Sequence, residues 1–267
     1  MASEMSPAVL TELSEHVLIV TINRPDALNA VNQAVWDGLG DALDRAQTDP
    51  AVRVVVITGA GDRAFCAGAD LKAIARHEFR TVPHPRYDAW GFAGVATHPI
   101  GKPVIASVNG IAFGGGWEIA LACDMVVTAD TARFGFPEVK RGLVAGGGGA
   151  LRLPRRLPPA LAMQVLLTGD PIDAQDAARW GLVNAVFPQA QVLTGALDLA
   201  GRIAANAPLA VQATKRIAAG IEGDRVPAED AGWHSNAHEL SLVLRSEDAA
   251  EGPRSFAEKR TPVWQGR

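Results

Sequence analysis

Short, almost continuous apolar runs constrain the fold of this chain more than any other feature. Three of them cover 52–58, 104–108 and 125–128. Runs of this length and composition are typical of strands buried on both faces of a sheet. They alternate with segments whose apolar residues recur at helical spacing, of which 31–46 is the clearest. The sequence therefore predicts an α/β fold.

The last third of the chain has a different pattern. From Pro158 onward the apolar spacing is almost entirely helical, apart from a strand-like stretch at 182–187. We therefore predict a core over residues 1–188, followed by a C-terminal helical region over 189–267. A hydrophobic content of 48% in 267 residues is enough for a sizeable core and argues against disorder.

Charge and composition exclude several classes of protein. The formal net charge of −4 and a pI of about 5.9 argue against binding to nucleic acid or to an anionic membrane. The N-terminus lacks the features of a signal peptide, and no apolar run approaches the ~20 residues that span a bilayer. Cys66 and Cys123 are too few for a disulfide framework or a cysteine-built zinc site. We expect a cytoplasmic protein.

Two glutamates beside glycine-rich segments indicate chemistry. Glu118 follows the segment 114–117, and Glu138 ends the segment 134–138, while 65–70 supplies a further glycine loop after an apolar strand. Free N–H groups in such loops can bind a developing oxyanion, and paired carboxylates can move protons beside it. Each loop alone is more commonly a tight turn, and spacing does not show whether the glutamates meet.

One glycine motif is misleading. The segment 59–64 matches the dinucleotide-binding pattern G-x-G-x-x-A. That pattern requires a helix through its third small residue and an acid at the end of the next strand. Here 65–68 is unsuited to a helix, and Glu78 falls within a predicted helix over 72–80. We therefore disfavour a dinucleotide-dependent oxidoreductase.

Several segments together carry a family resemblance. In chain order they are 23–30, 65–72, 103–110, 114–124, 134–138, 167–170, 181–184 and 256–260. With them the chain resembles an enoyl-CoA hydratase of the crotonase superfamily over nearly its whole length. The resemblance implies a spiral of ββα units with a C-terminal helical trimerisation region. It also implies reversible syn addition of water to a trans-2-enoyl-CoA, giving a 3-hydroxyacyl-CoA.

The resemblance assigns catalytic roles by position. The backbone N–H groups of Ala69 and Gly115 match an oxyanion hole for the thioester oxygen. Glu118 matches the residue that activates the water attacking C3, and Glu138 matches the one that delivers a proton to C2. Because some members keep only one of these glutamates, the presence of both favours hydration over isomerisation.

Binding residues are assigned in the same way. The CoA contacts implied by the resemblance are Ala27, Leu28, Ala67, Asp70, Leu71, Phe256 and Lys259, the last two often from a neighbouring subunit. The variable segment 76–99 is the expected wall of the acyl pocket, with Trp90 and Trp117 as pocket residues and Trp233 farther on. The spacing of His77, His84 and His98 suits no metal motif. No metal or cofactor is implied, CoA being part of the substrate, and the expected assembly is a homotrimer or hexamer.

Departures from the hydratase pattern leave alternatives open. The segment 146–151 reads Gly-Gly-Gly-Gly-Ala-Leu where a hydratase usually has Gly-Ala-Gly-Gly-Thr-Gln. The stretch 151–154 and the C-terminal tail resemble the carnitinyl-CoA dehydratase branch, which shares both glutamates. We expect an apolar, uncharged enoyl group, as in fatty-acid degradation, with carnitinyl-CoA dehydratase as the alternative. A non-catalytic or RNA-binding homologue is disfavoured because the helix at 31–47 is acidic.

Overall fold

A six-stranded sheet forms the centre of the computed structural model, which describes residues 6–76, 78–79 and 85–267. In spatial order its described strands are β1 (Val9–Ser14), β2 (Val17–Ile22), β3 (Val54–Gly59), β5 (Val104–Val108), β7 (Met125–Ala129) and β10 (Ala185–Phe187). The strands β1 and β2 form an antiparallel hairpin, and every following pair is parallel. The predicted α/β class is confirmed.

A second, smaller sheet explains how the site is assembled. Its described strands are β4 (Ala64–Cys66), β6 (Ile111–Phe113), β8 (Arg133–Gly135) and β9 (Ile172–Asp173). The first three each follow a strand of the large sheet after a short turn, and each leads into a helical segment: α2 (Leu71–Ala75), α4 (Gly115–Ala122) and the 3₁₀ helix η3 (Pro137–Arg141). This is the expected repetition of ββα units.

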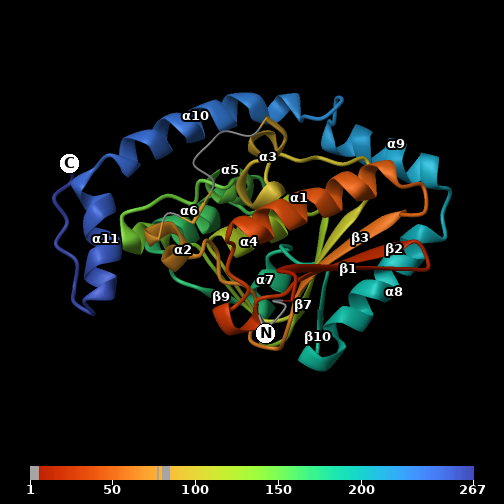
Figure 1. Ribbon diagram of the computed structural model, residues 1–267, viewed down its shortest axis with the longest axis horizontal. Helices are drawn as coiled ribbons and strands as arrows, with labels where there is room; N and C mark the ends of the chain where they lie inside the picture. The colour runs from red at the N-terminus through yellow and green to blue at the C-terminus, as the bar shows by residue number, and fades with distance from the viewer. Residues whose placement is uncertain (1–5, 77, 80–84) are drawn as a thin grey trace, which may run out of the picture.

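Helices cover the large sheet. The helix α1 (Gln33–Thr48) packs on β1, β2 and β3, while α8 (Val192–Ala204) packs on β3, β5 and β7, and Figure 1 shows the sheet between them. Every residue of β3 is buried in consequence. Covering both faces removes the need for polar residues on either side, which is why the strands read as continuous apolar runs.

Helical boundaries differ modestly from the sequence prediction. The helix α1 begins after Asn32, whose side-chain oxygen accepts a hydrogen bond from the Val35 N–H at 3.1 Å. The helix predicted over 72–80 is wrong in length, because α2 ends at Ala75; residues 77 and 80 lie outside the described residues. The remaining helices of the core are η1 (Pro25–Ala27), α3 (Pro85–Ala89), η2 (Phe92–Gly94), α5 (Gly149–Arg156), α6 (Pro159–Thr168), α7 (Ala174–Arg179) and η4 (Gln189–Gln191).

The C-terminal residues form long helices outside the sheet. These are α9 (Pro208–Ala219), α10 (Pro227–Leu244) and α11 (Glu247–Ala257). Figure 1 shows α10 crossing above α5, with α11 at the far end of the molecule. The helix α8 follows residue 188 in the chain but packs on the large sheet, together with the core. The predicted division of the chain at residue 188 therefore stays a prediction. No helix in the described part of the chain has the length and apolar character to cross a membrane, and the cytoplasmic location likewise stays a prediction.

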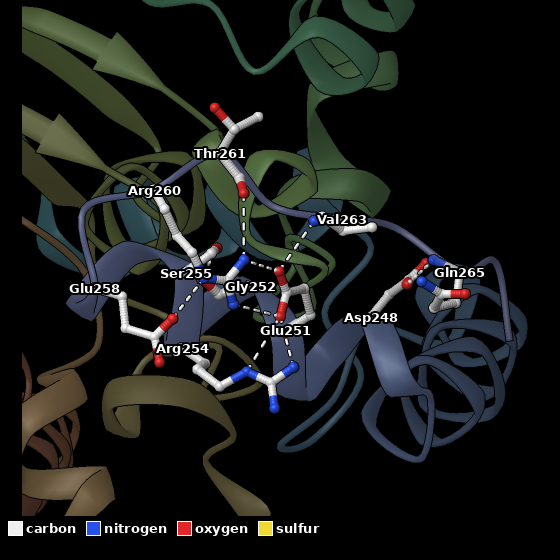
Figure 2. A network of polar contacts seen from close by, with 10 residues as sticks. All are labelled: Asp248, Glu251, Gly252, Arg254, Ser255, Glu258, Arg260, Thr261, Val263 and Gln265. Carbon is white, nitrogen blue, oxygen red and sulfur yellow. Dashed lines mark hydrogen bonds and ion pairs between the residues drawn. The ribbon is translucent and has the colours of Figure 1, made fainter.

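An ion-pair network fixes the C-terminal tail against α11 (Figure 2). Glu251 is 5% exposed and accepts hydrogen bonds from Arg254 at 2.6 Å and Arg260 at 2.8 Å. These guanidinium groups hold the pKa of the Glu251 carboxyl well below its usual range. Farther along the tail, the Gln265 N–H donates to Asp248 at 2.6 Å. The C-terminal tail is therefore bound to α11 at two points, through Arg260 and through Gln265.

Candidate active site

The parallel pairing of β4, β6 and β8 brings three loops together. The carboxyl ends of these strands lie side by side, so the segments 67–70, 114–118 and 136–138 meet at one edge of the small sheet. The approach is close enough to require glycine. A Cβ built on Gly116 would lie 1.9 Å from the Cys66 carbonyl oxygen, and one built on Gly68 would lie 3.2 Å from the Gly115 nitrogen.

Two backbone N–H groups remain unused where these loops touch. The hydrogen bonds of the described residues involve neither the Ala69 N–H nor the Gly115 N–H. Bonds on either side of Ala69 fix its loop: the Val31 N–H donates to the Gly68 oxygen at 2.8 Å, and the Asp70 N–H donates to the Val31 oxygen at 2.9 Å. Gly115 opens α4, where N–H groups have no intrahelical acceptor. This is the arrangement that an oxyanion hole requires, and the role itself stays a prediction.

Glu118 lies in the first turn of α4 and is 4% exposed. Its Oε1 accepts a hydrogen bond from the Gly149 N–H at 2.9 Å, at the start of α5. The Gly147 backbone also hydrogen-bonds the carboxylate. Burial raises the pKa of Glu118 to about 7, and these N–H groups oppose the rise because they stabilise the charged form.

Glu138 lies in η3 and faces the start of α4. A Cβ built on Gly114 would lie 2.8 Å from its Oε1, and its buried Oε2 has no hydrogen-bond partner among the described residues. Burial, together with the nearby charge of Glu118, raises the pKa of Glu138 to about 8. The structure therefore brings the two glutamates together, with one carboxyl hydrogen-bonded and the other free to exchange a proton.

An aromatic wall borders the site. A Cβ built on Gly115 would lie 2.3 Å from the Phe92 ring, and one built on Gly147 would lie 3.0 Å from the Phe92 Cβ. Phe92 thus contacts both the loop at Gly115 and the loop that holds Glu118. The Trp36 ring packs edge-on against Phe92 at 5.4 Å and against Phe79 at 6.4 Å. Trp36 could not be found from the sequence, because it belongs to no motif and shows only as one more residue of an amphipathic helix.

The two tryptophans predicted for the acyl pocket have core contacts. Trp117 stacks on Phe136 at 4.4 Å, and Trp90 stacks on His98 at 4.6 Å. Both side chains are buried, so their role as pocket residues gains no support and stays a prediction. The other two histidines of the segment 76–99, His77 and His84, lie outside the described residues. Within the described part of the chain, no cluster of His, Cys, Asp or Glu could hold a metal ion.

The predicted CoA residues near the N-terminus lie beside the loop at 67–70. The Ala67 N–H donates to the Leu28 oxygen at 3.0 Å, which places the stretch from Ala27 against this loop, and Leu71 is exposed nearby. Asp70 is different, because its carboxylate caps α2 and pairs with Arg24 at 2.9 Å. Its visible role is to hold the loop, and CoA binding by these residues stays a prediction.

The C-terminal CoA residues lie next to the segment that carries Glu138. The Arg141 guanidinium sits 4.0 Å from the Phe256 ring, which is 53% exposed, and Lys259 is exposed on the following turn. The helix α11 packs on η3 so tightly that a Cβ on Gly252 would lie 1.8 Å from the Arg141 oxygen. Phe256 therefore lies against the 3₁₀ helix that carries Glu138 in its own chain, and the contact of Phe256 and Lys259 with CoA stays a prediction.

A cavity of about 730 Å³ lies near the site without including it. Its lining contains Arg152, Arg156 and Trp233, but neither glutamate. Many of its charged groups are paired, such as Lys215 with Asp124 at 2.8 Å. The paired glutamates, not this cavity, mark the candidate active site.

The chain belongs to the enoyl-CoA hydratase/isomerase family, whose pattern matches residues 12–267. It is 45% identical to the carnitinyl-CoA dehydratase of Proteus mirabilis over 94% of this chain and 95% of that protein. With the carnitinyl-CoA dehydratase of Escherichia coli K12 the identity is 43%, covering 98% of this chain and all of the other.

Solved structures give the same result. A carnitinyl-CoA hydratase from Mycobacterium avium superposes with a TM-score of 0.95 at 53% identity, covering 98% of this chain and 100% of the other. An enoyl-CoA hydratase from Mycobacterium tuberculosis gives a TM-score of 0.76 at 46% identity with the same coverage. The family and these relatives support a hydratase or dehydratase.

Proposed function

We propose that this protein interconverts carnitinyl-CoA and crotonobetainyl-CoA by removing and adding water. The observation that carries the proposal is the likeness to carnitinyl-CoA dehydratases and hydratases at 43–53% identity over nearly the whole chain. The higher TM-score to the carnitinyl-CoA hydratase than to the enoyl-CoA hydratase, over equal shares of the chain, supports the same choice. The uncharged enoyl group favoured by the sequence analysis becomes the second candidate.

The proposed chemistry uses the two glutamates in complementary states. In hydration, the Glu118 carboxylate takes a proton from water, whose oxygen bonds to C3. Protonated Glu138 then gives its proton to C2, and the C2–C3 double bond becomes single. Dehydration reverses each step: ionised Glu138 removes the C2 proton, and the C3 hydroxyl leaves as water after receiving a proton from Glu118. The raised pKa values of both groups suit proton exchange near neutral pH.

The backbone donors would stabilise the charge that this reaction develops. Attack at C3 sends electrons through C2 to the thioester oxygen, which becomes negative. The N–H groups of Ala69 and Gly115 would bind that oxygen, so the oxyanion hole needs no side chain and no metal ion. CoA enters as part of the substrate, and the proposed reaction consumes no other cofactor.

The acyl group of crotonobetainyl-CoA ends in a trimethylammonium cation. Aromatic faces attract such cations at about 0.5–2 kcal/mol per contact. Phe92, which contacts the loops of the site, and Trp36, which packs on Phe92, are the aromatic residues to which we assign this attraction. The wall therefore suits a quaternary ammonium as well as an apolar chain.

A comparison of substrates tests the proposal. We expect kcat/KM for crotonobetainyl-CoA to exceed that for crotonyl-CoA by roughly tenfold, the equivalent of ~1.4 kcal/mol. A preference for crotonyl-CoA or longer enoyl-CoAs would establish the second candidate, which the 46% identical enoyl-CoA hydratase favours. Double-bond migration without water addition, or no turnover of any thioester, would contradict both.

A further inference from the structure

The glycine loop that holds Glu118 has little to fix it from within. Residues 146–149 are all glycine, and Gly148 adopts a φ of +112°, which favours glycine. No side chain caps the start of α5. Because glycine loses more conformational freedom on ordering than any other residue, four in succession form a stable anion-binding loop only if other segments hold them.

One face of α10 provides that contact. The Asn236 Nδ2 donates to the Gly146 oxygen at 2.8 Å. A Cβ built on Gly146 would lie 3.1 Å from Leu240, and one built on Gly148 would lie 3.0 Å from the Trp233 ring. Spacings of three and four residues place these three side chains on the same side of the helix. Figure 1 shows α10 above α5, the helix that the glycine loop opens.

Arg152 links this face to α5 and to the aromatic wall. Its Nη2 donates to Glu229 Oε2 at 3.0 Å and to the Ala96 oxygen at 2.7 Å, two residues beyond η2. The Trp233 Nε1 donates to the same Glu229 oxygen at 3.0 Å, and the Arg152 guanidinium lies 5.3 Å from the Trp233 ring. The Arg152 and Glu229 side chains are only 15% and 13% exposed, so the pair is shielded from solvent screening more than a surface ion pair.

We propose that Trp233, Asn236 and Leu240 of α10, together with the Arg152–Glu229 pair, position the 146–149 loop and through it the Glu118 carboxylate. Asn236 and Trp233 are then positioning residues for water addition. The inference rests on the proposed function in one respect, that Glu118 takes part in proton transfer. It assigns to the C-terminal helical region a direct effect on the chemistry of its own chain's core.

The contact between Asn236 and the 146–149 loop should affect how kcat depends on pH. Loosening the loop weakens the N–H bonds to Glu118 and so raises the pKa of that carboxyl. The other charged groups facing Glu118 are Glu138 from η3 and Arg152 from α5, and neither is changed by a substitution at Asn236. Since hydration requires ionised Glu118, the acidic limb of the kcat profile moves to higher pH.

The kinetic test compares Asn236→Ala with Ser235→Ala, an exposed residue on the same helix. We expect Asn236→Ala to lower kcat by about tenfold, to leave KM within about twofold, and to move the acidic limb upward. Trp233→Phe, which keeps a ring but loses the bond to Glu229, gives a smaller effect, and Ser235→Ala gives none. In a Glu118→Gln background the additional effect of Asn236→Ala falls below about twofold, because the group it positions is gone.

Hydrogen exchange measured by mass spectrometry tests the same contacts without relying on turnover. Asn236→Ala should speed exchange in the peptide spanning 143–152, while Ser235→Ala should not. Unchanged exchange and unchanged kcat in a folded Asn236→Ala protein overturn the inference, as does an equal loss of activity in both backgrounds. If instead the wild type turns over no thioester while exchange responds as expected, the proposed function fails and the positioning contact stands. If Asn236→Ala does not fold, Trp233→Phe tests the inference instead, by the same measurements of kcat and of hydrogen exchange.

Discussion

The two glutamates of the site show how surroundings divide roles between identical side chains. The Glu118 carboxylate accepts hydrogen bonds from backbone N–H groups, which favour its charged form. The Glu138 Oε2, in contrast, is buried and has no hydrogen-bond partner among the described residues. Both pKa values are raised by burial, and the charge of Glu118 adds to the rise at Glu138. The carboxyl with a buried, unpartnered oxygen therefore keeps its proton to higher pH, which suits it to act as the acid in hydration.

Replacing Glu138 by glutamine should separate activity from stability. We expect Glu138→Gln to lower kcat by ~10²–10⁴-fold, since it removes the proposed general acid–base. The folded protein holds the Glu138 proton to about pH 8, whereas an unfolded glutamate releases it near ~4.3. The free energy of unfolding of the wild type therefore falls as pH rises through this interval. The glutamine of Glu138→Gln does not ionise, so the variant does not show this fall.

Thermal melts at a series of pH values check this prediction. The Tm of Glu138→Gln should exceed that of the wild type most clearly near pH 9, and the difference should shrink toward pH 5. Glu12→Gln changes an exposed glutamate and serves as the control, with kcat and Tm unaltered. If Glu138→Gln kept the wild-type kcat and its Tm difference did not depend on pH, Glu138 would not be catalytic and burial would not raise its pKa.

At the level of elements, the ββα units place the three loops of the candidate site at one sheet edge, and glycine allows those loops to touch. Gly147 is the most direct case. A Cβ at this position would lie 2.3 Å from the Glu118 Oε2 and 3.0 Å from the Phe92 Cβ. A methyl group there must displace the carboxylate, the wall or the loop.

We therefore expect Gly147→Ala to lower kcat by about 10²-fold while the protein stays folded, because a shift of about 1 Å in a reacting group has an effect of that size. Gly201→Ala is the matched control, since a Cβ on this exposed glycine of α8 meets nothing within 4 Å. It should keep full activity and raise the free energy of unfolding by about 0.5–1 kcal/mol. Steady-state kinetics and chemical denaturation measure both. Equal activities for the two variants would contradict the assigned position of the Glu118 carboxylate.

The sequence predicts those elements whose signal is local. The strands β3, β5 and β7 were found because a sheet covered on both faces selects continuous apolar residues. The strands β4, β6 and β8 were missed because three residues give no measurable period and their pairing depends on chain segments far apart in sequence. The two-residue strand β9 was missed for the same reason. The strand β1 has six residues, but five of them are exposed, so burial imposes no apolar pattern on it.

The site follows the same division. Glu118, Glu138 and the glycine loops were found because motifs carry them. Trp36, however, is linked to the site only through its packing on Phe92 in the folded chain. The contact between Arg152 and Glu229 joins residues 77 positions apart and leaves no local signal. The sequence predicted segment 76–99, which contains Phe92, as the wall of the acyl pocket. Long-range packing adds Trp36 to Phe92 and supports the glycine loop, and the sequence alone could not predict either of these contacts.

At the scale of the whole molecule, the C-terminal helices are incompletely buried by their own chain. Neither α9 nor α10 contains a fully buried residue, although both carry apolar side chains. On α9, Leu209 is 78% exposed and Ile217 is 82% exposed, and their spacing of eight residues places them on one face. Apolar surface of this kind is typical of subunit interfaces.

We propose that copies of this chain cover the α9 face in a homotrimer or hexamer, as the family resemblance implies. Light scattering of the wild type at micromolar concentration should give three or six times the chain mass. The double variant Leu209→Ser/Ile217→Ser should shift the equilibrium toward smaller species, because each serine removes about 2 kcal/mol of apolar burial per interface. Leu10→Ser, at an exposed leucine on β1, is the control and should leave the mass unchanged. A wild type that stays monomeric would refute this assembly. It would also mean that Phe256 and Lys259 can serve only the active site of their own chain, the one beside which α11 already places them.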